Sequence, residues 1–161
     1  GKIYYNTRCH WDANPHPTRR RSAVSEDGGE SWKDFKVVEV LPDGLQHRAY
    51  GCMGGLVRLP INGRDILLFS NIDTEGEHRE RVTVWASFDG GKTWPVKRLV
   101  EPGRSAYSSL NAGRPDTPSE GQIYLHYEAG SGSKIARFNL TWLLDGEPTG
   151  DGDVPDWIKN S

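Results

Sequence analysis

The sequence predicts an all-β fold made of short antiparallel strands that are joined by tight turns. Three observations predict it: short apolar runs with period-two alternation recur along the chain, turn-forming residues separate them, and a sustained period of 3.6 residues is missing. The composition agrees, with 19 glycines and six tryptophans among 161 residues, because glycine favours turns and aromatic residues favour strands.

The expected strands follow one another at short intervals. The first covers residues 3–8 and is followed by a loop at residues 12–17 that contains two prolines. Pro42-Asp43-Gly44 and Asn62-Gly63 are strong turn signals between later strands. The remaining strands are expected at residues 19–25, 35–41, 50–59, 65–70, 81–87, 96–100, 107–110, 122–128 and 135–140.

Helical signals are confined to two short stretches near the end of the chain. Residues 141–144 and 157–159 each suggest a single helical turn. Residues 145–156 are acidic and contain glycine and proline, so they are expected to be a tail or linker.

An eight-residue motif occurs twice, at residues 25–32 and 87–94, and its first serines lie 62 residues apart. Both copies read S-x-D-G-G-x-[ST]-W. Asp27 and Asp89 can accept backbone N–H groups within the loop, and the glycines permit a positive φ. The tryptophan can pack into the gap beside the hairpin. The motif therefore predicts two hairpin turns of the same construction.

This motif resembles the Asp-box of sialidases and other β-propeller proteins. One box in about sixty residues suits a propeller blade of four strands. Residues 1–144 are therefore expected to form about half of a six-bladed β-propeller, its C-terminal blades, with an acidic Gly/Pro tail at residues 145–161. Because half a propeller leaves an open sheet edge, a missing N-terminal half or a companion fragment is expected to complete it.

The bulk properties exclude several classes of function. The formal net charge is −2, which gives no reason to expect binding to nucleic acid or membranes. The triplet Arg19-Arg20-Arg21 is expected to be a solvated strand end. No apolar run reaches the length of a membrane span, and the histidines and cysteines lack zinc-site spacing. No metal or cofactor is therefore expected, and Cys9 and Cys52 are either a lone disulfide or two free thiols.

Beyond the Asp-boxes, the chain resembles the exo-sialidases of the bacterial and animal Asp-box (BNR) family from residue 2 to residue 142. The resemblance rests on six short sequence segments. These segments are Asn6-Thr7-Arg8, Tyr50-Gly51-Cys52-Met53-Gly54-Gly55-Leu56, Leu67-Leu68-Phe69-Ser70-Asn71, Ala106-Tyr107-Ser108-Ser109-Leu110, Leu125-His126-Tyr127-Glu128 and Arg137-Phe138-Asn139-Leu140-Thr141-Trp142-Leu143.

The resemblance implies roles for individual residues. The family site has three arginines, a tyrosine nucleophile with a partner glutamate, and an aspartate acid/base. Arg8 resembles the second arginine and Arg79 the third, with Arg81 as the competitor of Arg79. Tyr107 resembles the nucleophile, and Glu128 resembles the carboxylate that orients the first arginine. Tyr107 and Glu128 are thus the predicted catalytic residues, and Arg8 and Arg79 the predicted substrate-binding residues.

The implied activity is release of terminal sialic acid from glycoconjugates with retention of configuration. Paired guanidinium groups suit the sialic acid carboxylate, and a neutral phenol avoids the like-charge repulsion that an attacking carboxylate would meet. The first arginine, the partner glutamate and the acid/base aspartate are expected in the missing half, so the isolated chain is expected to be inactive. A non-catalytic propeller for carbohydrate binding or assembly, and a trans-sialidase, are the alternatives. The resemblance also implies an extracytoplasmic location.

Overall fold

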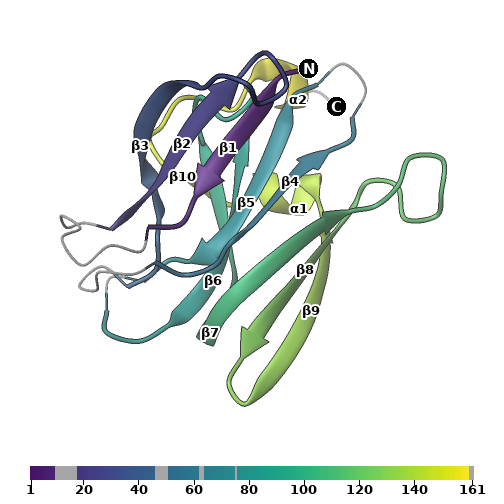
Figure 1. Cartoon of the computed structure of the whole chain (residues 1–161). Helices are drawn as coiled ribbons and strands as arrows, with labels where there is room; N and C mark the ends of the chain where they lie inside the picture. Colours follow the sequence, from purple (N-terminus) through teal and green to yellow (C-terminus); the bar gives the residue numbers. More distant parts are fainter. Residues whose placement is uncertain (10–17, 46–50, 62–63, 75, 160–161) are drawn as a thin grey trace.

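The computed structural model describes residues 1–9, 18–45, 51–61, 64–74 and 76–159 (Figure 1). Most of the regular structure is antiparallel β, as the sequence predicts. The predicted loop at residues 12–17 and the Asn62-Gly63 turn lie outside the described residues.

A small sheet opens the chain. It contains β1 (Ile3–Thr7), β2 (Arg19–Ser25) and β3 (Lys33–Pro42), in the order β1-β2-β3. Antiparallel pairing between β1 and β2 runs without a break from Ile3 opposite Ser25 to Thr7 opposite Arg21. The strand pair thus carries the chain directly to Arg8, at the end of β1.

The second sheet has seven strands, and six of them form the path β4-β5-β6-β7-β8-β9. A seventh strand pairs with β7 from outside this path. The bounds are β4 (Gly55–Leu59), β5 (Ile66–Ile72), β6 (Glu80–Ser87), β7 (Val96–Ala112), β8 (Gln122–Ala129), β9 (Gly132–Asn139) and β10 (Glu147–Pro148).

Strand β7 joins the two halves of this sheet. The sequence predicts separate strands at residues 96–100 and 107–110, whereas the structure has one strand of 17 residues. Its first half pairs with β6 and its second half with β8, with register shifts on both sides. Figure 1 shows the resulting curl, in which β8 and β9 turn away from β1, β2 and β3.

The two repeated motifs form the same hydrogen-bonded turn. Ser25 and Ser87 each donate a hydroxyl hydrogen bond to the motif aspartate and accept the N–H of the glycine four residues later. Asp27 and Asp89 each accept a backbone N–H from a residue further along the loop. The predicted positive φ is present at Gly28, Gly29, Gly90 and Gly91.

The two motif tryptophans differ in burial. Trp94 is fully buried, with its ring centroid 6.2 Å from that of Phe69 and 6.3 Å from that of Tyr4. Trp32 is 37% exposed and meets the edge of Tyr5 at 5.5 Å. The predicted packing is confirmed for Trp94, while Trp32 reaches only part of it because fewer residues cover its hairpin.

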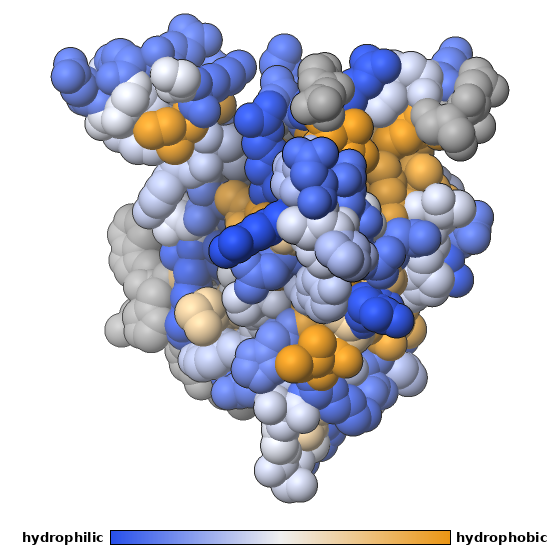
Figure 2. Space-filling view, turned by 90° about the vertical axis from the view of Figure 1, so that its right-hand side faces the viewer, coloured by the Kyte–Doolittle hydropathy of each residue, from blue (hydrophilic) through white to orange (hydrophobic). Residues whose placement is uncertain are grey.

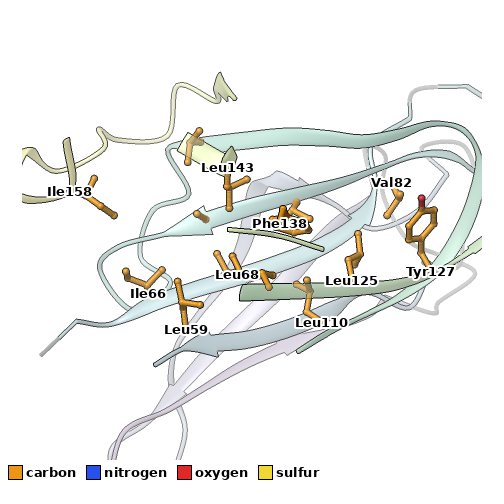
Figure 3. Close-up of a cluster of buried hydrophobic side chains, with 14 residues drawn as sticks. Leu59, Ile66, Leu68, Val82, Leu110, Leu125, Tyr127, Phe138, Leu143 and Ile158 are labelled. Carbon is orange, nitrogen blue, oxygen red and sulfur yellow. The ribbon is translucent and has the colours of Figure 1, made fainter. Parts of the chain in front are cut away.

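The main apolar core lies along the second sheet (Figure 3). A second cluster joins the two sheets, because Val38 and Leu41 of β3 pack against Phe69, Trp85 and Trp94. Burying aromatic and aliphatic side chains of this size contributes about 1.5–3 kcal/mol each. The first sheet is therefore anchored to the second by apolar contact.

The segment after Leu144 packs back onto the second sheet, where the sequence predicts a tail or linker. The expected helical turns are present as α1 (Leu140–Leu144) and α2 (Asp156–Lys159), and Ile158 is buried in the main core. Between them, β10 pairs with the start of β7. Contacts with residues that are distant in the sequence thus hold this acidic segment in a defined structure.

The surface carries several exposed apolar side chains. Within the described part of the chain, no helix has both the length and the apolar character that a membrane crossing needs. Figure 2 shows one face on which apolar residues form separate patches among polar ones. The large apolar side chains that are exposed are Ile3, Tyr5, Trp32, Phe35, Val37, Met53, Leu56, Ile61 and Ile135.

Candidate active site

Two arginines that flank different strands lie beside one tyrosine ring. The Cζ atom of Arg8 is 5.6 Å from the centroid of the Tyr107 ring, and the Cζ atom of Arg79 is 5.2 Å from it. Arg8 follows β1, Arg79 precedes β6, and Tyr107 lies in the second half of β7. Distances of this size allow favourable interaction between a cation and an aromatic ring. The fold therefore brings these three sequence-predicted residues together.

Tyr107 occupies an irregular part of β7. Ser105 is opposite Ala129 and Ser108 is opposite Tyr127, so β7 has one more residue than β8 in this interval. Such a bulge changes the direction of a side chain and is common near active sites. Tyr107 is half-buried against a small apolar cluster that includes Cys52. The bulge thus leaves the ring partly accessible.

Glu128 contacts the backbone of Tyr107. The Tyr107 N–H donates a hydrogen bond to Glu128 Oε2 over 3.2 Å, and the Glu128 side chain is otherwise exposed. A charge-assisted hydrogen bond of this kind restrains the backbone of the bulge. Glu128, the fourth predicted residue, therefore lies beside Tyr107.

Arg8 retains unused hydrogen-bonding capacity. Its Nε atom is buried and has no hydrogen-bond partner among the described residues. A buried N–H without an acceptor costs free energy, and a bound anion would remove that cost. Arg8 is therefore suited to bind a carboxylate.

Arg79 and Arg81 have different environments. Arg81 is exposed, has a φ of 62°, and donates from Nε to the carbonyl oxygen of Asp73 over 3.2 Å. Its backbone conformation is rare for a residue with a Cβ atom. Arg79 instead lies beside Tyr107, so the geometry favours Arg79 over its competitor.

A pocket of about 540 Å³ adjoins these residues and is lined by Arg79 and Glu128. Arg104, His78 and Glu77 also line it, which gives it charged groups of both signs. Ser105 and Ala106 also line it. A polar ligand held by Arg79 would have room beside it here.

Both cysteines are free and buried, which settles the alternative left open by the sequence. Burial raises the pKa of the Cys52 thiol to about 11, although the nearby charges of Arg79 and Arg8 act in the opposite direction. Cys52 therefore remains a neutral thiol near the site. Among the described residues, no group of three or more histidine, cysteine or acidic side chains is arranged to hold a metal ion.

Arg20 and Asp43 were not found by sequence reasoning. The triplet Arg19-Arg20-Arg21 is expected to be a solvated strand end, and this is wrong for Arg20, which is 5% exposed and forms an ion pair with Asp43. The reason is strand alternation, which turns Arg20 to the face opposite its two neighbours. Alternation within the triplet was the signal that could have identified it.

The chain was compared with protein-family models and with known proteins. No family model matches the chain. A sialidase of Micromonospora viridifaciens is 38% identical over 129 residues, which are 77% of this chain and 18% of that protein.

Two solved structures are also similar. The Hadza microbial sialidase Hz136 has 25% identity and a TM-score of 0.61, with 89% of this chain and 26% of that chain covered. An intramolecular trans-sialidase from Ruminococcus gnavus, solved in complex with oseltamivir carboxylate, has 20% identity and a TM-score of 0.66, with 89% and 31% covered. At its lower identity, the second structure shows likeness of fold alone. The chain spans less than a third of the length of each of these proteins.

Proposed function

This chain is a sialidase-related segment that covers part of the sialidase chains it matches, and from this we propose that it supplies part of an exo-sialidase active site. The reaction is release of a terminal sialic acid from a glycoconjugate, with Tyr107 as nucleophile and net retention of configuration. The observation that carries the proposal is the approach of Arg8 and Arg79 to the same Tyr107 ring, at 5.6 and 5.2 Å.

The chemistry of the substrate explains why these residue types are suitable. A sialic acid has its carboxylate on the anomeric carbon, where the nucleophile attacks. Arg8 and Arg79 are proposed to bind that carboxylate, because planar guanidinium groups form paired hydrogen bonds to it. Tyr107 is proposed to attack as a phenol activated by a glutamate base, which avoids placing a second carboxylate beside the first.

Glu128 has a supporting role in this proposal. It orients a further arginine, contributed by another part of the protein, while its contact with the Tyr107 N–H restrains the bulge. The acid/base aspartate and the partner glutamate are proposed to come from that other part as well. On this proposal the 161-residue chain alone has no activity.

We place the chain in about half of a six-bladed β-propeller, with Asp-box hairpins at its two repeated motifs. Exposed apolar side chains on the first sheet support this, since Phe35 is 75% exposed and Val37 is 46% exposed on β3, while Tyr5 is 49% exposed on β1. Exposed apolar residues that lie close together mark surfaces that another part of a protein covers.

The test uses the complete protein that contains this chain and a fluorogenic sialoside. Tyr107→Phe is expected to lower kcat by at least about 100-fold, because the nucleophilic oxygen is removed. Tyr124→Phe is the matched control, since Tyr124 is also half-buried but lies further along the sheet, on β8 opposite Asn111. Full activity of Tyr107→Phe would contradict the proposed role of Tyr107 as nucleophile.

Transfer in place of hydrolysis is the catalytic alternative to this proposal. Analysis of the released sugar distinguishes the two, because hydrolysis gives free sialic acid and transfer gives a product linked to an acceptor or to itself. Binding of a sialoside by a wild-type protein without turnover would indicate the non-catalytic alternative.

A further inference from the structure

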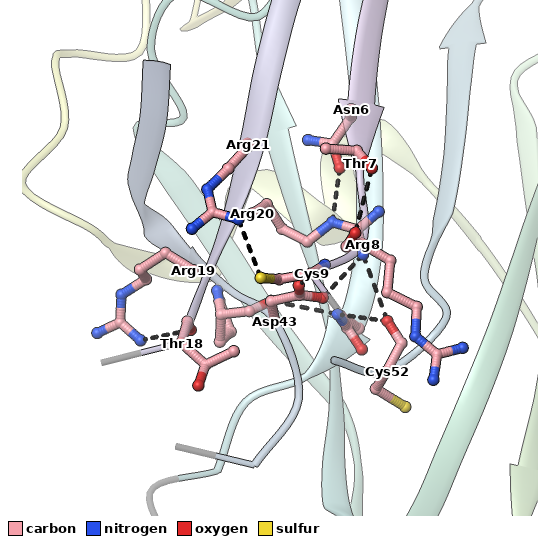
Figure 4. Close-up of polar contacts among 12 residues, drawn as sticks. Asn6, Thr7, Arg8, Cys9, Thr18, Arg19, Arg20, Arg21, Asp43 and Cys52 are labelled. Atoms are coloured by element: carbon pink, nitrogen blue, oxygen red, sulfur yellow. Dashed lines mark hydrogen bonds and ion pairs between the residues drawn. The ribbon is translucent and has the colours of Figure 1, made fainter. Parts of the chain in front are cut away.

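The Arg20–Asp43 pair is buried beside the candidate active site, and the proposed function does not use it. Arg20 Nη1 lies 2.8 Å from Asp43 Oδ1, and the side chains are 6% and 0% exposed. Figure 4 shows the pair among the residues at the ends of β1, β2 and β3. A buried ion pair is weak support for stability, because desolvation offsets the attraction between its charges. Stability alone therefore does not account for the pair, and its contacts point to a role in fixing local geometry.

The pair holds the chain on both sides of Arg8. Arg20 Nε donates to Asn6 Oδ1 over 2.6 Å, two residues before Arg8. On the other side, the Cys9 N–H donates to Asp43 Oδ2. One ion pair thus contacts both the residue before Thr7 and the residue after Arg8, while the Nε of Arg8 has no protein partner in the described structure.

The surroundings of Asp43 allow little movement. A Cβ atom at Gly51 would lie 2.3 Å from Asp43 Oδ1, so the backbone there must approach the carboxylate closely. The Gly51 N–H donates to the carbonyl oxygen of Cys9 over 2.5 Å. From β5, Asn71 Nδ2 donates to the carbonyl oxygen of Pro42 over 3.1 Å. These contacts fix the carboxylate and, through it, the backbone at Cys9.

From these contacts we propose that the Arg20–Asp43 pair positions Arg8 for binding the substrate carboxylate, with Asn6 as the link to β1. Arg20 and Asp43 are positioning residues, since they act through Arg8. This inference rests on the proposed function for the identity of the ligand, and on the contacts alone for the positioning.

Two variants of the complete protein test it. Arg20→Lys keeps a charge against Asp43 but cannot also hold Asn6, because lysine lacks the planar fork of arginine. Asn6→Ala removes the hydrogen bond from Arg20 to Asn6 and leaves the ion pair intact. This variant therefore tests the positioning of Arg8 even if Arg20→Lys does not fold. Arg58→Lys is the matched control, as Arg58 forms an exposed ion pair of 2.9 Å with Asp65.

Two measurements are made on each variant. The first is the KM and kcat for a fluorogenic sialoside. Arg8 is proposed to hold the carboxylate in both the ground state and the transition state, so both test variants are expected to raise KM by about tenfold with a smaller change in kcat. The second is the position of the Arg8 side chain in crystal structures, which is expected to shift in both variants and not in Arg58→Lys.

The outcomes separate this inference from the proposed function. An unmoved Arg8 in the folded variants overturns the positioning role, whatever KM does. If Arg8 is displaced and KM is unchanged, the positioning role is supported. The same result would contradict the proposed role of Arg8 in substrate binding. If the wild-type protein does not hydrolyse the sialoside, the proposed function fails, and the crystal structures still decide whether the pair positions Arg8.

Discussion

Thr93 donates two hydrogen bonds to the carboxylate of Asp89, from its backbone N–H over 3.0 Å and from its hydroxyl over 2.8 Å. Ser87 adds a third donor at 2.9 Å. Burial by itself would raise the pKa of Asp89, but these hydrogen bonds to the charged form outweigh it and lower the pKa. The turn is therefore built around an ionised aspartate.

This geometry predicts how stability depends on pH. A carboxyl group whose pKa is lowered by folding contributes stability above its unfolded pKa of about 3.9, and this is lost as the pH falls through the lower folded value. Because much of the Asp89 residue still faces solvent, its contribution is limited to about 1 kcal/mol. Between about pH 5 and pH 2, the melting temperature of Asp89→Asn is expected to fall less than that of the wild type.

The control for this comparison is Asp153→Asn, which changes an exposed carboxylate elsewhere in the chain. It is expected to follow the wild-type curve. Parallel curves for the wild type and Asp89→Asn would contradict the assigned role of Asp89. Asp27 has the same kind of partners, and hydrogen bonds led by that from the Ser31 hydroxyl also lower its pKa, so Asp27→Asn is expected to act in the same direction.

The segment after Leu144 is expected to stabilise the second turn. Asp151 Oδ2 accepts the Trp94 N–H over 3.0 Å, and Thr149 donates its hydroxyl to the Trp94 carbonyl oxygen over 2.6 Å. Asp151→Ala leaves the N–H of a fully buried tryptophan without its acceptor, which is expected to cost about 1–3 kcal/mol. Urea unfolding measures the loss, and limited proteolysis should cut the segment faster than in Asp153→Ala. Equal protease resistance of the two variants would show that the contact is dispensable.

Cys52 is expected to resist thiol reagents in the folded protein. With its pKa raised to about 11 by burial, only about 0.1% of the thiol is ionised at pH 8, and the thiolate is the reactive form. Alkylation by iodoacetamide followed by mass spectrometry is expected to be slow in buffer and fast in urea. A native rate equal to that of an unfolded peptide would contradict the burial of Cys52, and Cys9→Ala assigns the signal to the correct thiol.

Local sequence patterns were sufficient for most strands and both repeated turns. In both motifs the hydrogen bonds between the first serine and the aspartate join residues two positions apart, so these partners can be read from the local sequence. The start of β2 at Arg19 and the end of β6 at Ser87 follow from alternation and turn chemistry, which are also local.

Features that depend on distant partners were missed. The ion pair of Arg20 joins residues 23 positions apart, and the Trp94 contact to Asp151 joins residues 57 positions apart. The continuity of β7 depends on two different neighbours, β6 and β8, which each bond to one half of it. Sequence alone left Arg79 and Arg81 as competitors, because the positive φ at Arg81 is a backbone property that the residue type does not indicate.

Arg79 and Arg81 give the last prediction, which compares the same change at two neighbouring positions in the complete protein. Arg79→Lys removes a guanidinium beside Tyr107 and is expected to raise KM for a sialoside by about 10–100-fold, since a lysine cannot form paired hydrogen bonds to a carboxylate. Arg81→Lys changes a residue whose Nε donates to the Asp73 carbonyl oxygen, so its KM is expected to stay within about twofold of the wild-type value. Steady-state kinetics at constant ionic strength measures both. A larger effect at Arg81 than at Arg79 would reverse the assignment of Arg79 as the third carboxylate-binding arginine.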